Sequence, residues 1–122
     1  MLDTSEVMAF VATTKPAESR EFYSRLGLRL IEESDFAIVF DAHGTMLRIQ
    51  KVESLDPPPF TVLGWRVDDI AAAIAELADA GVEMTRYPGM DQDDLGVWHA
   101  PSGGLIAWFA DPDGNTLSLA QL

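Results

Sequence analysis

Apolar and polar residues alternate over short stretches of the chain, which is the pattern of half-buried strands. Strands are predicted at residues 6–13, 28–33, 36–41, 45–51, 60–67, 82–87, 95–100, 105–110 and 115–121. Two stretches have helical spacing instead. One runs from Pro16 to about Leu26 after a possible Thr14 cap, and the other has Ile70, Ala73, Ile74 and Leu77 on one face after Asp68 or Asp69. The sequence therefore predicts strands in runs, with one helix in each half.

The two halves repeat the same pattern. Gly27 and Gly81 each end a predicted helix, and Gly44 and Gly114 each close a hairpin turn. The two turn glycines lie farther apart than the two helix-ending glycines do. The second copy is therefore the longer one, and its extra residues lie between its helix and its last hairpin. An internal repeat of this size predicts two similar supersecondary units.

The order β-α-β-β-β, found twice, predicts an α+β fold with a mainly antiparallel sheet. A length of 122 residues suits one domain. Within it we expect repeat one at about 6–52, a stiff proline linker at 54–59 and repeat two at about 60–122. The extra residues, at about 87–104, are expected to form a wall beside a binding site.

Charge and composition exclude several classes of function. The formal net charge is −12 with only eight basic residues, which disfavours binding to nucleic acid or to an anionic membrane surface. There is no cysteine, so neither disulfides nor thiolate chemistry is available. No signal peptide or transmembrane run is apparent, and we expect a cytoplasmic protein.

Three motifs resemble those of the vicinal oxygen chelate superfamily, which includes glyoxalase I, bleomycin-resistance proteins and extradiol dioxygenases. They are Phe22-Tyr23-Ser24-Arg25-Leu26-Gly27-Leu28, Val67-Asp68-Asp69-Ile70 and Trp108-Phe109-Ala110-Asp111-Pro112-Asp113-Gly114-Asn115. The resemblance implies an open, curved sheet around a pocket, with half of the sheet from each repeat. Many members are dimers, so we expect a homodimer.

Metal-dependent members carry four ligands, on the first and last strands of each copy. Carried over by the motifs and the repeat, these positions are Met8, Arg48, Val62 and Ser118. None is a usual ligand for a divalent metal, and an arginine would repel a cation. We therefore expect neither a metal site of this kind nor a cofactor.

Strand alternation adds candidate ligand contacts around these four positions. The candidates are Met8, Phe10, Met46, Arg48, Gln50, Val62, Tyr87, Trp98, His99, Trp108 and Ser118, a set that mixes apolar surface with a few polar groups. Arg48 is equally a ligand anchor or a surface charge. Alternation does not decide whether Trp108 or Phe109 faces the pocket, and His99 has no partner evident from the sequence.

Two functions are consistent with this sequence. The first is a metal-independent small-molecule-binding protein of the glyoxalase/bleomycin-resistance type, which sequesters or senses a partly aromatic, possibly anionic ligand. The alternative is an enzyme of the same superfamily, a lyase, isomerase or dioxygenase, with a non-standard active site. The fold that the motifs imply hosts both kinds of protein, so it does not choose between them.

Overall fold

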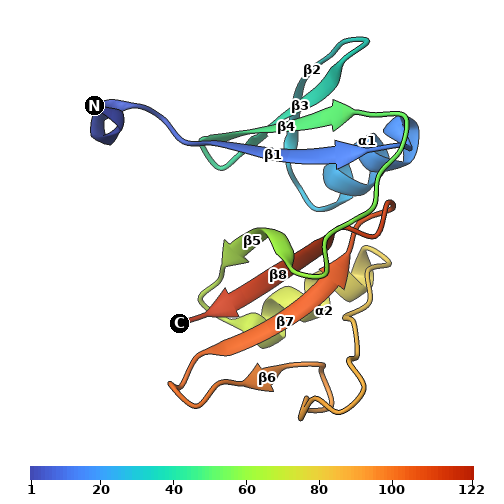
Figure 1. The fold of residues 1–122 in the computed structure, drawn as a ribbon. Coiled ribbons are helices and arrows are strands. Elements are labelled where there is room, and N and C mark those ends of the chain that lie inside the picture. The colour runs from blue at the N-terminus through green and yellow to red at the C-terminus, as the bar shows by residue number, and fades with distance from the viewer. The chain divides into compact units, whose positions relative to one another are not determined.

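A computed structural model describes all of residues 1–122, which form two compact units, residues 1–56 and 57–122. The division falls within the proline-rich stretch at 54–59. Each unit contains one α-helix and one four-stranded sheet in the order β-α-β-β-β (Figure 1). This is the α+β architecture that the sequence predicts.

The first unit begins with a short 3-10 helix and then builds its sheet around a single α-helix. Its elements are η1 (Leu2–Thr4), β1 (Met8–Thr13), α1 (Pro16–Arg25), β2 (Arg29–Glu33), β3 (Ala37–Ala42) and β4 (Thr45–Lys51). The strand order is β1-β4-β3-β2, in which β1 runs parallel to β4 and the other two pairs are antiparallel.

The second unit repeats this topology. Its elements are β5 (Thr61–Arg66), α2 (Ile70–Asp79), β6 (Trp98–His99), β7 (Leu105–Ala110) and β8 (Thr116–Gln121). The order is β5-β8-β7-β6, again with the first and last strands parallel. Each sheet therefore has its first and second strands as edges.

The pairing registers confirm the repeat independently of the glycines. Phe10 pairs with Arg48 in the first unit, and Gly64 pairs with Ser118 in the second. Gly64 lies as far beyond Phe10 as Gly81 lies beyond Gly27, so the strands and the helix ends repeat with one offset. Gly27 and Gly81 both have the left-handed backbone that ends a helix, with φ of 94° and 83°.

The strand predicted at 82–87 is absent, which corrects the sequence analysis. The backbone N–H of Thr85 donates to the carbonyl of Trp108 at 2.7 Å, but no ladder follows. The carbonyl of Thr85 instead accepts from the Gln92 side chain at 3.0 Å, so a side-chain amide takes the place of a neighbouring strand. The strand predicted at 95–100 contracts to the two residues of β6.

The helix caps also differ in part from the prediction. Thr14 does not cap α1; the hydroxyl of Thr13 accepts from the Lys15 N–H at 3.0 Å and shares a buried hydrogen bond of 2.6 Å with Ser19. At α2, Asp69 accepts from the Ala72 N–H at 3.1 Å, as one of the two expected caps. α1 therefore begins without a side-chain cap, whereas α2 begins with one.

The core of each unit lies between its helix and one face of its sheet. In the first unit, Tyr23 of α1 contacts Phe40, with ring centroids 6.1 Å apart. In the second, Trp65 stacks on Phe109, and the Ile70 N–H at the start of α2 donates to the Gln121 side chain at 2.9 Å. Figure 1 shows α2 on one face of its sheet, which leaves the other face without a helix. None of the helices has the length and apolar character needed to cross a membrane.

Val7 shows where strand alternation stops applying. Val7 has the sequence parity of the helix-facing side, but β1 starts only at Met8 and Val7 retains 79% of its exposure. Parity has no meaning before the strand begins, because only the pleated backbone sends alternate side chains to opposite faces.

Candidate functional site

Five candidate residues lie together on the helix-free face of the first sheet, called here the first open face. They are Met8 and Phe10 on β1 and Met46, Arg48 and Gln50 on β4. The apolar members keep 44–51% of their exposure, which is high for methionine and phenylalanine in strands. The register places Phe10 directly beside Arg48, so apolar surface adjoins the guanidinium.

The side chain of Arg48 is half-buried and forms no ion pair or hydrogen bond. Other basic residues of this unit are paired. Arg20 and Lys51 both contact Glu33, at 2.9 and 2.7 Å, and hold the pKa of that carboxyl below its usual value, Lys51 most strongly. The chain has 20 acidic residues, yet this partly desolvated guanidinium pairs with none of them. It is therefore available to donate hydrogen bonds to an anionic or carbonyl group of a ligand.

The metal-ligand positions carried over from the resemblance need one adjustment. The ladder of the second sheet pairs Thr61 with Thr116 and then Leu63 with Leu117, so Val62 is the extra residue of a bulge. Thr61, rather than Val62, is thus the ladder counterpart of Met8. The neutral hydroxyl of threonine is a weaker ligand than the imidazole and carboxylate groups that usually bind zinc, nickel, manganese or iron in such sites. No cluster of three or more histidine, cysteine, aspartate or glutamate side chains that could hold a metal ion occurs in the chain.

Three aromatic candidates meet on the helix-free face of the second sheet, called here the second open face. Trp108 contacts Tyr87 edge-on at 5.6 Å between ring centroids and Trp98 at 6.3 Å. Phe109 is instead 1% exposed and lies on the helix side. The structure therefore resolves the alternative that the sequence left open, with Trp108 on the open face beside its cross-strand partner Ser118.

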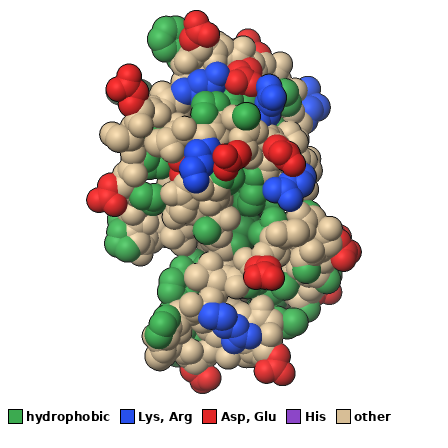
Figure 2. All heavy atoms as spheres, turned by 90° about the vertical axis from the view of Figure 1, so that its right-hand side faces the viewer, with side chains coloured by type: hydrophobic (Ala, Val, Ile, Leu, Met, Phe, Trp, Pro, Cys, Tyr) green, Lys and Arg blue, Asp and Glu red, His purple; other side chains and the backbone are tan.

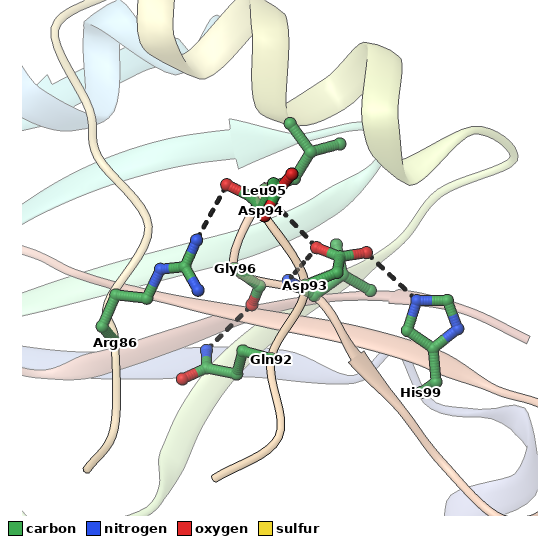
Figure 3. Close-up of polar contacts among 8 residues, drawn as sticks. Arg86, Gln92, Asp93, Asp94, Leu95, Gly96 and His99 are labelled. Atoms are coloured by element: carbon green, nitrogen blue, oxygen red, sulfur yellow. Dashed lines mark hydrogen bonds and ion pairs between the residues drawn. The ribbon is translucent and has the colours of Figure 1, made fainter.

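His99 lies on the other side of β6 from Trp98, so these neighbours do not share a wall. Its Nε2 is 3.0 Å from Asp93 Oδ2, which supplies the carboxylate partner that the sequence did not reveal (Figure 3). Asp93 Oδ1 also accepts from the N–H groups of Leu95 and Val97 at 2.9 and 3.0 Å. The His99 contact, followed by the backbone donors, lowers the pKa of the Asp93 carboxyl.

Gln92 organises the rest of this loop. Its Oε1 accepts from the Tyr87 N–H at 2.8 Å, and its Nε2 donates to the carbonyls of Thr85 and Gly96 at 3.0 and 2.9 Å. Arg86 spans the loop to the Asp94 carbonyl at 2.8 Å, as Figure 3 shows. Sequence reasoning missed Gln92 and Asp93 because Asp91–Asp94 resembles a solvated polar stretch. Residues 85–99 are in fact held together by side-chain hydrogen bonds.

Arg66 ends β5, two and three residues before Asp68 and Asp69. Its side chain is exposed and forms no ion pair or hydrogen bond with either of them or with any other residue. On the face shown in Figure 2, basic side chains stand among acidic and hydrophobic ones and form no continuous basic surface. On this face the cations therefore stand singly.

Comparisons with known proteins agree on the fold. The family model described as Glyoxalase/Bleomycin resistance protein/Dioxygenase superfamily matches residues 6–119. Among solved structures, a bleomycin resistance determinant encoded on the transposon Tn5 has 23% identity and a TM-score of 0.76, over 97% of this chain and 98% of that one. A bleomycin-binding protein complexed with bleomycin has 22% identity and a TM-score of 0.75, with coverage of 98% and 99%.

A lactoylglutathione lyase from Agrobacterium tumefaciens is also similar, with 15% identity and a TM-score of 0.71 over 96% of this chain and 93% of that one. No curated protein matches the sequence. At these identities the solved structures establish the fold alone.

Proposed function

Because the chain belongs to the glyoxalase/bleomycin resistance protein/dioxygenase superfamily, we propose that it binds a small, partly aromatic molecule without the help of a metal ion. In this proposal the first open face supplies the contacts, and the protein sequesters or senses its ligand. A bleomycin-binding protein complexed with bleomycin has the same fold, which supports a binding role here.

Arg48 is the observation that carries the proposal. By the repeat it occupies the strand position where metal-dependent relatives are expected to hold a glutamate ligand. A glutamate there would hold a cation, which would in turn hold the oxygens of the substrate. An unpaired arginine offers a fixed positive charge and several donors directly. Met8, Phe10 and Met46 surround it with apolar surface, and such surface strengthens a charged hydrogen bond by excluding water.

The test is a thermal-shift and calorimetric screen of small aromatic and anionic compounds, repeated on variants with the best hit. Arg48→Ala should weaken binding about ten- to a hundredfold, since a charge-assisted hydrogen bond is lost, and Arg48→Lys should restore part of it. Arg29→Ala is the matched control, because Arg29 is exposed and pairs with Asp41 at 3.6 Å. Equal affinity in wild type and Arg48→Ala would refute this role.

Metal independence has its own measurement. Protein purified without chelators should contain no stoichiometric zinc, nickel, manganese or iron by elemental analysis, and ligand affinity should be unchanged by EDTA. One equivalent of metal whose removal abolishes binding would favour the alternative, an enzyme or binder with a non-standard metal site.

We further propose a cytoplasmic homodimer. A chain without cysteine suits a reducing compartment, since it has no disulfide to maintain. Each sheet leaves two edge strands, and unpaired edges in a folded protein need a cover. The exposed apolar residues of β1 are the surface that best supports such an interface.

A further inference from the structure

Gly64 is a glycine that the backbone does not require. Its φ lies outside the positive range that favours glycine, unlike Gly27, Gly81 and Gly114. A glycine inside a strand weakens the strand and often marks a place where a ligand or another backbone approaches closely. Its repeat counterpart is the bulky Phe10, so the two open faces differ at the same point in the fold.

The surface over Gly64 is shallow and partly polar. A Cβ at this position would lie 2.8 Å from Ser118 Oγ and 3.3 Å from the Ser118 carbonyl, so the serine hydroxyl already lies close over the glycine. The neighbouring positions on the same face of β8 are Thr116 and Ala120, which are also small. Together Gly64, Ser118 and Ala120 form a low floor on the second open face.

An aromatic wall borders this floor. Trp108 pairs with Ser118 across the sheet, and Tyr87 and Trp98 contact the Trp108 ring. The loop that carries Tyr87 is held in place by the Gln92 amide, which accepts from the Tyr87 N–H. A wall positioned in this way before binding loses little conformational entropy when a flat ring packs against it.

A single cation stands at the opposite side of the floor. Arg66, on the edge strand β5, pairs in register with Ala120 of β8, and its side chain is exposed without an ion pair or hydrogen bond. Strands β7 and β5 are separated by β8, so their backbones lie about 9–10 Å apart. That distance matches the length of a molecule that has one ring, or two fused rings, and an acidic substituent.

From these features we infer that the second open face is a shelf for a flat aromatic carboxylate. The ring lies on Gly64 and Ser118 with one edge against Trp108, and the carboxylate pairs with Arg66. Gly64 determines specificity because any side chain there would displace the Ser118 hydroxyl and raise the floor. This inference rests on the proposed small-molecule binding, but it uses a different unit and a different arginine.

The experiment measures binding of 2-naphthoate and its neutral isostere 2-naphthamide by calorimetry and tryptophan fluorescence. Wild type should bind naphthoate about tenfold more tightly than naphthamide, because only the carboxylate pairs with Arg66. Arg66→Gln should abolish this preference and leave naphthamide binding unchanged. Gly64→Ala should weaken both probes about tenfold through the raised floor. Arg29→Ala, an exposed arginine of the first unit that lies outside both proposed sites, should change naphthoate affinity less than twofold. Arg48→Ala is measured in parallel, to show whether naphthoate binds to the first unit instead.

Arg66→Gln keeps the assay interpretable if Gly64→Ala folds poorly, since Arg66 is exposed and has no partner to lose. Three results overturn the shelf: naphthoate fails to bind, its affinity is indifferent to both shelf variants, or it depends on Arg48 instead. The proposed function is judged separately, by whether any compound in the wider screen binds in an Arg48-dependent way.

Discussion

Asp111 and Asp41 occupy equivalent turns of the two repeats but differ in depth. Asp111 is 5% exposed, and its Oδ1 accepts from the Asp113 and Asn115 N–H groups, both at 3.0 Å. Its Oδ2 accepts from the Asn115 side chain at 2.8 Å. Asp41 accepts from one N–H, that of Gly44 at 3.2 Å, near solvent. The sequence shows the same turn twice, whereas only the packing shows which carboxylate is buried.

Asp111→Ala should therefore lower the free energy of unfolding by about 2–4 kcal/mol, because three donors lose a charged acceptor in a buried turn. Asp41→Ala, the matched control, should cost about 1 kcal/mol or less, since water replaces both its hydrogen bond to the Gly44 N–H and its solvent-accessible ion pair with Arg29. Urea unfolding curves of the two variants measure both values. Equal losses would mean that the buried hydrogen bonds contribute no more than the exposed one.

For single residues, the sequence predicts the face of the sheet to which some side chains point but not others. Alternation assigns Trp65 and Leu117 to the helix-facing side and Arg48 to the other side. In the structure Leu117 is fully buried, Trp65 stacks on the buried Phe109, and Arg48 lies on the open face. It could not choose between Trp108 and Phe109, because both are aromatic and a one-residue shift in register exchanges them. The bulge at Val62 shows the same limit, since an extra residue resets parity without a sequence signal.

The segment between α2 and β6 is the part of the chain in which sequence and structure differ most. Its polar run at 91–94 is typical of a solvated loop, yet Asp93 accepts from the N–H groups of Leu95 and Val97 and lies within hydrogen-bond distance of His99. Asp93→Ala should make the Leu95 and Val97 amides exchange with deuterium about tenfold faster, because each loses a charge-assisted acceptor. Asp91→Ala is the matched control, since Asp91 forms no hydrogen bond. Equal rates in the two variants would contradict the role given to Asp93.

The same contacts give this loop a pH dependence. The lowered pKa of Asp93 means that its carboxylate is favoured in the folded loop, so its contribution is complete above the ordinary value of 3.8 and is lost as the pH falls through the lower folded value. Amide exchange at Val97, corrected for intrinsic rates, should accelerate below about pH 4 in wild type. Asp93→Asn should remove this acceleration, and its persistence there would assign it to another group.

At the scale of the molecule, the repeat and the motifs were sufficient to predict the fold, since glycines, turns and hydrophobic periodicity all agreed on it. The family match over residues 6–119 confirms that prediction. The ligand could not be predicted in the same way, because it depends on individual side chains placed on a fold that many proteins share. The proposals about the ligand rest instead on single residues, such as the unpaired side chain of Arg48 and the missing side chain at Gly64.

The proposed homodimer is the prediction that belongs to this scale. Light scattering at micromolar concentration should give about twice the chain mass of 13.3 kDa. Phe10→Glu should shift the protein toward monomer, because it places a charge among exposed apolar residues of the edge strand β1. Phe36→Glu, at a residue 76% exposed beside the β2–β3 hairpin, is the control and should remain dimeric. A wild-type monomer would refute the proposal.

The Gln92 side chain has one more consequence, because its amide satisfies the Tyr87 N–H and the Thr85 carbonyl as a peptide group of a neighbouring strand would. Because a side chain and not a strand makes these hydrogen bonds, the residues between Tyr87 and Gln92 need not pair in register with another strand. Residues 88–91 are exposed and make few hydrogen bonds of their own, so their length and sequence can change while Tyr87 stays in place. This segment is therefore the natural position for grafting or randomisation when new ligand specificities are selected from this scaffold.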